Sequence, residues 1–259
     1  MSPTRAAVVD LDGTVWRGQR LVDGADAGLA TLRERMPVVF LTNGTGLRPE
    51  RFADRLEAVG LPRDASEVVT AASATAAYVA DACPGARTFV VGTDPLREAC
   101  RAAGVTVVES GPADVLVVGR APELDQALLQ RTLEAVGPET AFVAANTDAT
   151  HPVEGGEEPG AGATVGAIRG MLDREPTVVG KPSTRMARRA ADVLGVDPAE
   201  CLLVGDRLET DIRMGEDADM TTVLVLSGAT DRRDLSETET RPDHVVDSLG
   251  DIGEVLEGP

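Results

Sequence analysis

Polar side chains suited to binding a cation and a phosphate follow short apolar runs at four separate points of the chain. They belong to Asp10 and Asp12, Thr42 and Asn43, Lys181, and Asp206 with Asp211. In open α/β sheets, ligands bind beyond the carboxyl ends of the strands. If the four runs are strands of one such sheet, their polar ends meet in a single site.

The charges of this predicted site require a cation. The carboxylates of Asp10, Asp12 and Asp206 would carry about −3 charges, and a bound phosphoryl group adds nearly −2. At ~4 Å and an effective dielectric constant near ~20, each like-charge pair costs about 4 kcal/mol. A divalent metal ion together with Lys181 would offset most of that cost. Oxygen ligands and a phosphate co-ligand favour Mg²⁺ over zinc.

The spacing of Asp10 and Asp12 indicates how the pair would divide the chemistry. Because side chains alternate along a strand, residues two apart emerge on the same side, and Gly13 then permits a sharp turn. One carboxylate would be an ionised nucleophile, while its neighbour, protonated, would donate to the leaving oxygen. Taken singly, each segment also fits a turn, a helix cap or a solvated loop, so the prediction depends on their conjunction.

The elements that must position these residues read as an α/β protein. Eleven β-branched or apolar runs, interleaved with segments of helical periodicity, predict parallel strands covered on both faces. The runs lie at 6–9, 38–41, 68–70, 88–91, 105–108, 115–118, 141–145, 177–179, 202–204, 222–226 and 244–246. That number is large for a single open sheet, so we expect two sheets.

Composition excludes several classes of protein. The chain has 259 residues and a formal charge of −18, which argues against nucleic acid or acidic membrane as partners. It has no apolar run long enough to span a bilayer and no signal-peptide pattern, and its three cysteines lack metal-site spacing, so we expect a cytoplasmic protein. Lys181 is the only lysine among 25 basic residues. Acidity with so little lysine suggests a halophilic, salt-adapted protein, and coding bias toward arginine is the alternative.

The motifs resemble the haloacid dehalogenase (HAD) superfamily of hydrolases, in its NagD-like, 4-nitrophenylphosphatase branch. The resemblance covers nearly the whole chain and is carried by stretches at 10–18 (DLDGTVWRG), 40–44 (FLTNG), 145–148 (ANTD), 159–162 (PGAG), 180–182 (GKP), 205–212 (GDRLETDI) and 242–249 (PDHVVDSL).

The resemblance implies a role for each site residue. Asp10 would be the nucleophile that forms an aspartyl phosphate, and Asp12 would be general acid and then general base. The implied Mg²⁺ site consists of the Asp10 carboxylate, the Asp12 backbone carbonyl and Asp206, with Asp211 orienting a metal-bound water. The implied phosphate-binding residues are Thr42, Asn43, Gly44 and Lys181.

The resemblance also implies two domains. A HAD-like catalytic core would comprise residues 1–82 and 177–259, and an inserted α/β cap, which selects the substrate, would comprise 83–176. His151 would contact the substrate, and an exposed loop histidine is the alternative. For Trp16, core packing beside the site is favoured over stacking on the ligand. Related proteins often dimerise through their caps, which raises a homodimer as one expectation.

The predicted activity is therefore Mg²⁺-dependent hydrolysis of small phosphomonoesters through a covalent aspartyl phosphate. Sugar phosphates, phosphoglycolate, pyridoxal phosphate and nucleotide monophosphates are the candidate substrates. A non-hydrolytic phospho-acceptor resembling receiver domains is the alternative, because those domains also pair strand-end aspartates with Thr and Lys. Asp12, which supplies an acid and base that a receiver lacks, favours the hydrolase.

Overall fold

The protein, seen here as a computed structural model that describes residues 4–62, 64–153, 156–236 and 238–257, folds into two compact units. The first unit comprises Met1–Thr42, Pro49–Val69 and Lys181–Pro259. The second comprises Asn43–Arg48 and Thr70–Gly180. The chain therefore passes between the units four times.

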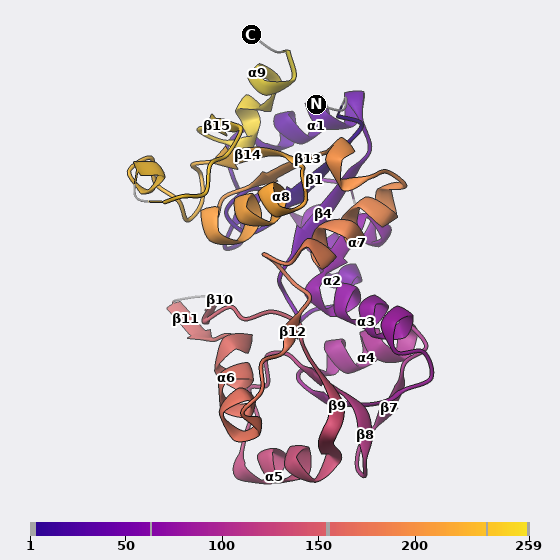
Figure 1. The fold of residues 1–259 in the computed structure, drawn as a ribbon. Coiled ribbons are helices and arrows are strands. Elements are labelled where there is room, and N and C mark those ends of the chain that lie inside the picture. The colour runs from indigo at the N-terminus through magenta and orange to yellow at the C-terminus, as the bar shows by residue number, and fades with distance from the viewer. Residues whose placement is uncertain (1–3, 63, 154–155, 237, 258–259) are drawn as a thin grey trace. The chain divides into compact units, whose positions relative to one another are not determined.

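A six-stranded sheet forms the centre of the first unit, in the order β15-β14-β13-β1-β4-β5 (Figure 1). The strands are β1 (Ala6–Asp10), β4 (Val38–Thr42), β5 (Val68–Thr70), β13 (Cys201–Gly205), β14 (Thr221–Val225) and β15 (His244–Val246). Strands from β15 to β4 pair in parallel, and every residue of β1, β4 and β13 is buried. Burial on both faces explains why these strands are continuously apolar until their last residues.

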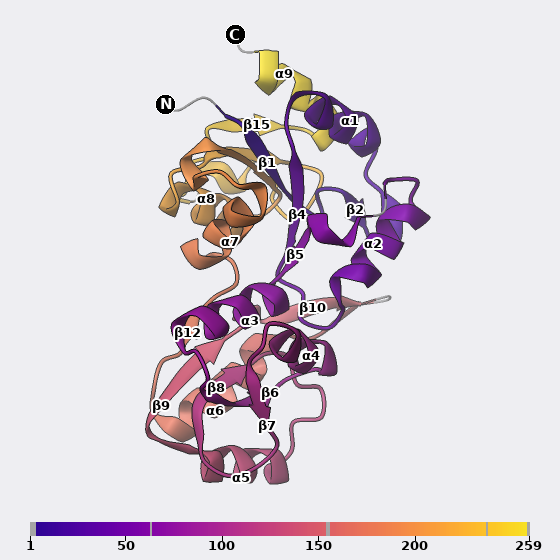
Figure 2. The same ribbon diagram turned by 90° about the vertical axis from the view of Figure 1, so that its right-hand side faces the viewer.

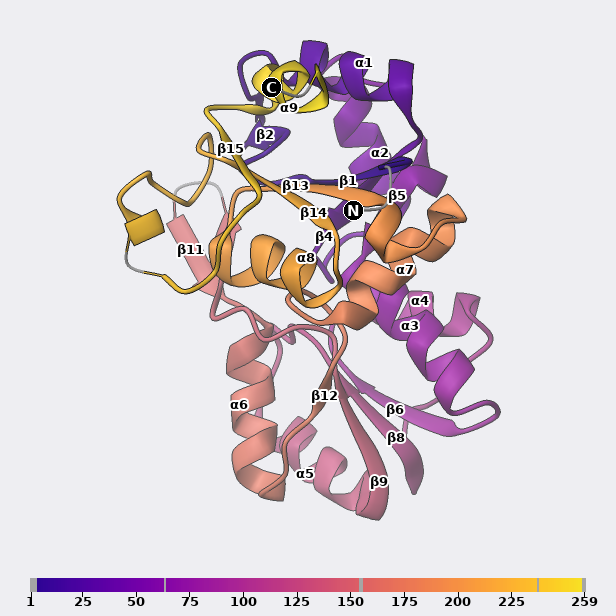
Figure 3. The ribbon, with the colours of Figure 1, turned by 45° about the horizontal axis from the view of Figure 1, so that its top comes forward.

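Helices cover both faces of this sheet, with α7 and α8 on one side and α1 and α9 on the other (Figures 2 and 3). The helices are α1 (Ala25–Arg35), α2 (Pro49–Ala58), α7 (Thr184–Leu194), α8 (Arg213–Asp217) and α9 (Ile252–Glu257). Short helical turns are η1 (Ala65–Glu67), η2 (Pro198–Glu200), η3 (Leu208–Ile212), η4 (Asp234–Ser236) and η5 (Leu249–Asp251). A small hairpin, β2 (Trp16–Arg17) with β3 (Arg20–Leu21), follows β1.

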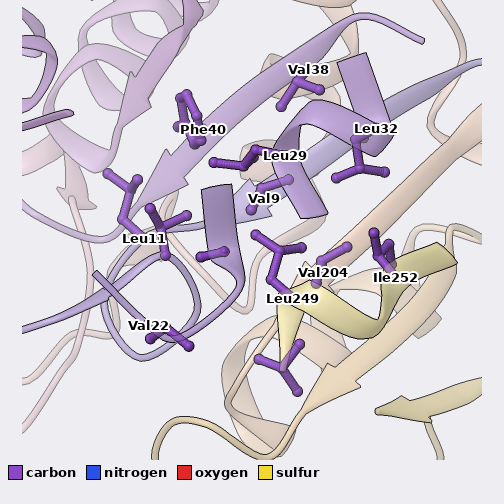
Figure 4. Packing of buried hydrophobic residues seen from close by; sticks show 14 of the residues in the cluster. Val9, Leu11, Val22, Leu29, Leu32, Val38, Phe40, Val204, Leu249 and Ile252 are labelled. Carbon is purple, nitrogen blue, oxygen red and sulfur yellow. The ribbon is translucent and has the colours of Figure 1, made fainter. Parts of the chain in front are cut away.

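The core of the first unit lies between the sheet and the helices α1 and α9 (Figure 4). Leu29 and Leu32, three residues apart on α1, point toward Val9 of β1 and Leu249 of η5. All four side chains are at most 2% exposed. This packing fixes β1, and with it the position of the residues at its carboxyl end.

The second unit has its own five-stranded parallel sheet, in the order β12-β9-β8-β6-β7. The strands are β6 (Arg87–Val91), β7 (Thr106–Val108), β8 (Ala113–Val118), β9 (Val136–Ala144) and β12 (Thr177–Val178). The helices α3 (Ala71–Ala82) and α4 (Asp94–Ala102) lie on one face, and α5 (Gln126–Ala135) and α6 (Ala161–Leu172) lie on the other (Figure 2). An antiparallel hairpin, β10 (Thr150–Val153) with β11 (Gly156–Pro159), precedes α6.

The predicted α/β class with two parallel sheets is confirmed, and each of the eleven apolar runs overlaps one of their strands. The unit boundaries differ from the predicted division at 83 and 176. Residues 43–48, 70–82 and 177–180 group with the second unit, because α3 packs against α4 and β12 pairs with β9. No helix in the described part of the chain has both the length and the apolar composition needed to cross a bilayer.

Candidate functional site

Three buried carboxylates meet at the carboxyl ends of two central strands in the first unit. Asp10 is the last residue of β1, Asp206 directly follows β13, and Asp211 lies in η3. Each offers a carboxylate oxygen, and these oxygens lie within 4.8 Å of one another. The three residues are 6%, 2% and 1% exposed. This group, hereafter the acidic cluster, is the densest negative charge that the described residues bury.

The local backbone explains why these side chains converge. β1 and β13 are neighbours in parallel register, with Val9 opposite Val204, so their ends lie at the same edge of the sheet. The chain then enters η3, a π-helical turn of a kind often found at functional sites, which carries Asp211. A Cβ at Gly205 would lie 2.5 Å from Cγ of Asp211, so only glycine leaves room for this approach.

Lys181 is the cation buried against the acidic cluster. Its Nζ donates hydrogen bonds to Asp10 and to Oδ1 of Asp211, the latter at 2.6 Å, and the residue is 4% exposed. Lys181 reaches this position from a loop after β12, a strand that belongs to the other sheet. The strand-end pattern thus brought Lys181 to the acidic cluster, although β12 belongs to the five-stranded sheet and not to the sheet of β1 and β13.

Burial and mutual repulsion perturb the acidic cluster. Burial raises the pKa of Asp10 well above its usual range, and the charges of Asp211 and Asp206 add to that effect against the opposing charge of Lys181. Burial, with the charge of Asp211, raises the pKa of Asp206 to about 6. Burial alone would lower the pKa of Lys181, but the Asp10 and Asp211 charges outweigh it, so that this pKa lies above the ordinary lysine value. Three carboxylates with one ammonium leave a net charge of about −2 when all are ionised.

A loop after β14, whose residues were not among the predicted site residues, holds Asp206 in place. The Ala229 N–H donates to Oδ2 of Asp206 at 2.7 Å. A Cβ on Gly13 or Gly228 would lie 2.2 Å or 2.0 Å from that same oxygen, so both glycines are required for the fit. Ser227 Oγ donates to the Gly13 carbonyl at 2.8 Å and joins this loop to the turn after β1. The available signal was Gly228, two residues after the apolar run 222–226.

The other oxygen of Asp206, Oδ1, is buried and lacks a hydrogen-bond partner among the described residues, as a cation ligand would. Burying a carboxylate oxygen without a hydrogen-bond donor costs free energy, because the hydrogen bonds to water are lost and are not replaced. Three carboxylates, a residual charge of about −2 and an unsatisfied oxygen together fit a hard divalent cation such as Mg²⁺.

Asp12 lies near the acidic cluster in sequence but has different partners. The alternation of side chains along a strand predicts that Asp12 emerges beside Asp10. In the structure β1 ends at Asp10, and Oδ1 of Asp12 accepts a hydrogen bond from the indole nitrogen of Trp16 at 2.8 Å. The Asp12 side chain is 47% exposed. The third carboxylate of the cluster is therefore Asp211 rather than Asp12.

The Thr-Asn-Gly segment after β4 is divided between the two units. Thr42 is buried at the end of β4, one residue beyond Leu41, which pairs with Asp10. Asn43 and Gly44 belong to the second unit. There, Nδ2 of Asn43 donates to both carboxylate oxygens of Asp148, at 3.0 Å and 3.1 Å. The Asp148 carboxylate therefore holds Asn43, a contact that the sequence did not reveal.

His151 lies in the second unit, on β10 of the antiparallel hairpin. It is half-buried and stands opposite Glu158 of β11. Arg120, two residues beyond β8, forms an ion pair with Glu158 and so holds the hairpin to the end of that strand. Substrate contact by His151 stays a prediction.

Comparison with known proteins identifies the family. A model of haloacid dehalogenase-like hydrolases matches residues 7–106, and a HAD-hydrolase-like model matches 178–252. An acid sugar phosphatase of Staphylococcus saprophyticus is 30% identical over 258 residues, which cover 99% of this chain and 100% of that relative.

Two solved structures are similar along almost the entire chain. A p-nitrophenyl phosphatase from Archaeoglobus fulgidus superposes with a TM-score of 0.91 at 32% identity, covering 98% of this chain and 100% of its own. NagD from E. coli superposes with a TM-score of 0.90 at 28% identity, covering 96% and 98%. The chain therefore belongs to the haloacid dehalogenase-like hydrolases, in the branch that contains NagD and the p-nitrophenyl phosphatases.

Proposed function

We propose that this protein is a Mg²⁺-dependent phosphatase that hydrolyses small phosphomonoesters through an aspartyl phosphate on Asp10. Its relatives include proteins named as phosphatases, so the chain is a phosphoric monoester hydrolase by family. The acidic cluster with Lys181 is the observation that carries the proposal, because three buried carboxylates and one ammonium suit a cation and a phosphate bound together. Phosphoryl transfer needs mainly positioning and charge neutralisation, which such a site supplies.

Asp10 is the proposed nucleophile. Its carboxylate oxygen attacks phosphorus, a phosphorus–oxygen bond forms, and the bond between phosphorus and the leaving oxygen breaks. Lys181, which contacts both Asp10 and Asp211, keeps Asp10 oriented and offsets negative charge during this step. When bound, Mg²⁺ supplies further charge neutralisation for the phosphoryl group, and the carboxylates of the acidic cluster are the residues that would hold it.

Asp12 is the proposed general acid and base. It donates a proton to the leaving oxygen in the first step and takes a proton from the water that attacks the aspartyl phosphate in the second. Hydrolysis then releases inorganic phosphate and restores the Asp10 carboxylate. The partial exposure of Asp12, in contrast to the buried acidic cluster, supports this role because the group that moves the proton must meet both substrate and water.

The second unit is the proposed cap, in which we assign substrate selection to the hairpin that carries His151. Sugar phosphates are the first class to test, and phosphoglycolate, pyridoxal phosphate and nucleotide monophosphates follow. Thr42, Asn43 and Gly44 are the proposed contacts to the phosphoryl oxygens. The homodimer and the cytoplasmic location raised by the sequence stay predictions.

The proposal is tested by the turnover of 4-nitrophenyl phosphate with Mg²⁺ and with excess EDTA. We expect turnover only with Mg²⁺, and its loss in Asp10→Asn. Asp12→Asn should permit slow phosphorylation of Asp10 but block release, so the phosphorylated protein should accumulate in acid-quenched samples. Asp247→Asn, at an exposed surface ion pair, is the matched control and should retain full turnover.

Two results would contradict the proposal. Turnover that is indifferent to EDTA would remove the metal from the mechanism, and an active Asp10→Asn variant would exclude the covalent route. If one phosphate were incorporated per chain without catalytic turnover in the wild-type protein, the phospho-acceptor alternative would be correct.

A further inference from the structure

Trp16, the only tryptophan of the chain, is fully buried beside the acid and base proposed above. Its indole nitrogen donates to Oδ1 of Asp12 at 2.8 Å. An indole N–H can only donate, and buried tryptophans generally find an acceptor. Here the acceptor is a carboxylate, and such charge-assisted hydrogen bonds are about twice as strong as neutral ones. Core packing alone therefore does not account for Trp16.

Arg55 of α2 approaches both Trp16 and Asp12. Its guanidinium carbon lies 4.2 Å from the centroid of the indole ring, within the range of a cation–π interaction. Its Nη1 lies 3.7 Å from the same Asp12 oxygen that accepts the indole hydrogen bond. Its Nη2 donates to the carbonyl of Gly18, at the tip of the β2–β3 hairpin. One arginine thus contacts the ring, the carboxylate and the hairpin.

The backbone fixes the distance between Trp16 and Asp12. The Trp16 N–H donates to the Leu11 carbonyl at 3.1 Å, and the Trp16 carbonyl accepts from the Gly13 N–H at 2.7 Å. These two bonds bracket Asp12 on both sides. Because catalytic groups must be held within about 0.5 Å of productive geometry, a support of this kind matters to the rate.

We propose that Trp16 and Arg55 are positioning residues that hold Oδ1 of Asp12 and leave its Oδ2 to exchange the proton with the leaving oxygen and with water. This inference rests on the proposed function and adds to it the side chains that support the acid and base. It also gives the single tryptophan a role distinct from stacking on the ligand.

The dependence of rate on the leaving group tests this role. 4-Nitrophenolate leaves readily without a proton, whereas phenolate needs one, and the two aryl phosphates differ little in size. The quantity measured is the ratio of kcat/KM for phenyl phosphate to kcat/KM for 4-nitrophenyl phosphate. Trp16→Phe, which keeps a buried ring but has no donor, should lower this ratio about 10-fold or more, since general acid catalysis is worth about 10²–10⁴ in rate.

The matched control is Phe52→Leu, which removes a buried ring from α2 in the same hydrophobic core but leaves the indole donor in place. It should lower both kcat/KM values by the same factor, if at all. Arg55→Met provides a second test at a part-exposed residue, in case Trp16→Phe fails to fold, and should lower the ratio in the same direction.

A double-variant cycle completes the test. In the Asp12→Asn background, which has no acid to position and does not turn over, the rate of Asp10 phosphorylation is measured for each substrate, and Trp16→Phe should leave the ratio of the two rates unchanged. Equal losses for the two substrates in Trp16→Phe and in Arg55→Met would overturn the inference while leaving the proposed function intact. A wild-type protein that turns over neither substrate would instead refute the proposed function.

Discussion

Asp206 gives rise to a prediction that separates stability from activity. The residue is 2% exposed, one of its carboxylate oxygens has no partner among the described residues, and its pKa is raised to about 6. A carboxyl group with a higher pKa in the folded than in the unfolded protein binds protons more tightly when folded. Its ionisation therefore destabilises the fold as the pH rises from the unfolded pKa toward the folded one.

The magnitude follows from the shift. Between an unfolded pKa of 3.8 and a folded pKa of about 6, full ionisation costs ~3 kcal/mol of unfolding free energy. The substitution Asp206→Asn removes the charge and keeps the shape, and its amide oxygen can still accept from Ala229. In excess EDTA, the variant should gain ~3 kcal/mol over wild type near pH ~7.5 and only ~1 kcal/mol near pH ~4.5.

The assay is urea unfolding followed by far-UV circular dichroism at the two pH values. Saturating Mg²⁺ should shrink or reverse the gain, since a ligand at ~100 times its Kd stabilises the wild-type fold by ~2.7 kcal/mol and the variant has lost part of the site. Turnover should be lost in the variant throughout. Asp247→Asn, at an exposed residue, should change stability by less than ~0.5 kcal/mol at either pH.

The prediction fails if Asp206→Asn gains the same unfolding free energy over wild type at both pH values, because the effect would then not arise from ionisation of Asp206. It also fails if the variant is less stable than wild type near pH ~7.5 in EDTA. The second result would mean that the Asp206 carboxylate is satisfied in the fold without a metal ion.

Two further substitutions test the surroundings of the site. Lys181→Met should lower the unfolding free energy by ~3–5 kcal/mol near neutral pH, because it leaves two buried carboxylates without their cation. The control Arg232→Met, at an exposed ion pair, should cost less than ~1 kcal/mol. Equal urea midpoints for the two variants would contradict this prediction. Gly228→Ala should reduce kcat by at least ~10-fold, since the new Cβ would lie 2.0 Å from Oδ2 of Asp206. The control Gly253→Ala, with open space around the new Cβ, should retain wild-type kcat. A fully active Gly228→Ala variant would show that the loop after β14 does not hold the carboxylate.

The fold could be predicted from the sequence largely because it is built from parallel strands. The strands β1, β4, β5 and β13, which are buried throughout, read as continuous apolar runs. Partly exposed strands such as β7 and β12 were still marked by short β-branched runs. The hairpins β2–β3 and β10–β11 escaped prediction, since they are short and, in β11, fully exposed.

The candidate site could be predicted only where local spacing determines it. Asp10 and Asp206 end neighbouring strands, so pattern alone brought them together. The side-chain contacts of Asp12 depend on where β1 ends and on the position of Arg55 in α2. The alternation of side chains along a strand predicts neither of these. The Asn43–Asp148 contact joins positions far apart in the sequence, and no sequence motif predicts it.

The interleaving of the two units has a consequence for biosynthesis. Most of the second unit is the continuous stretch 70–180, so it can begin to fold while the ribosome is still making the remainder. The central strand β1 emerges first, yet its neighbour β13 is made only when residues 201–205 appear. Until then one side of this largely apolar strand has unpaired backbone hydrogen-bonding groups, an arrangement prone to aggregation. The nascent chain therefore carries this unpaired strand edge until residues 201–205 are made, and a chaperone that shields β1 would act during that interval.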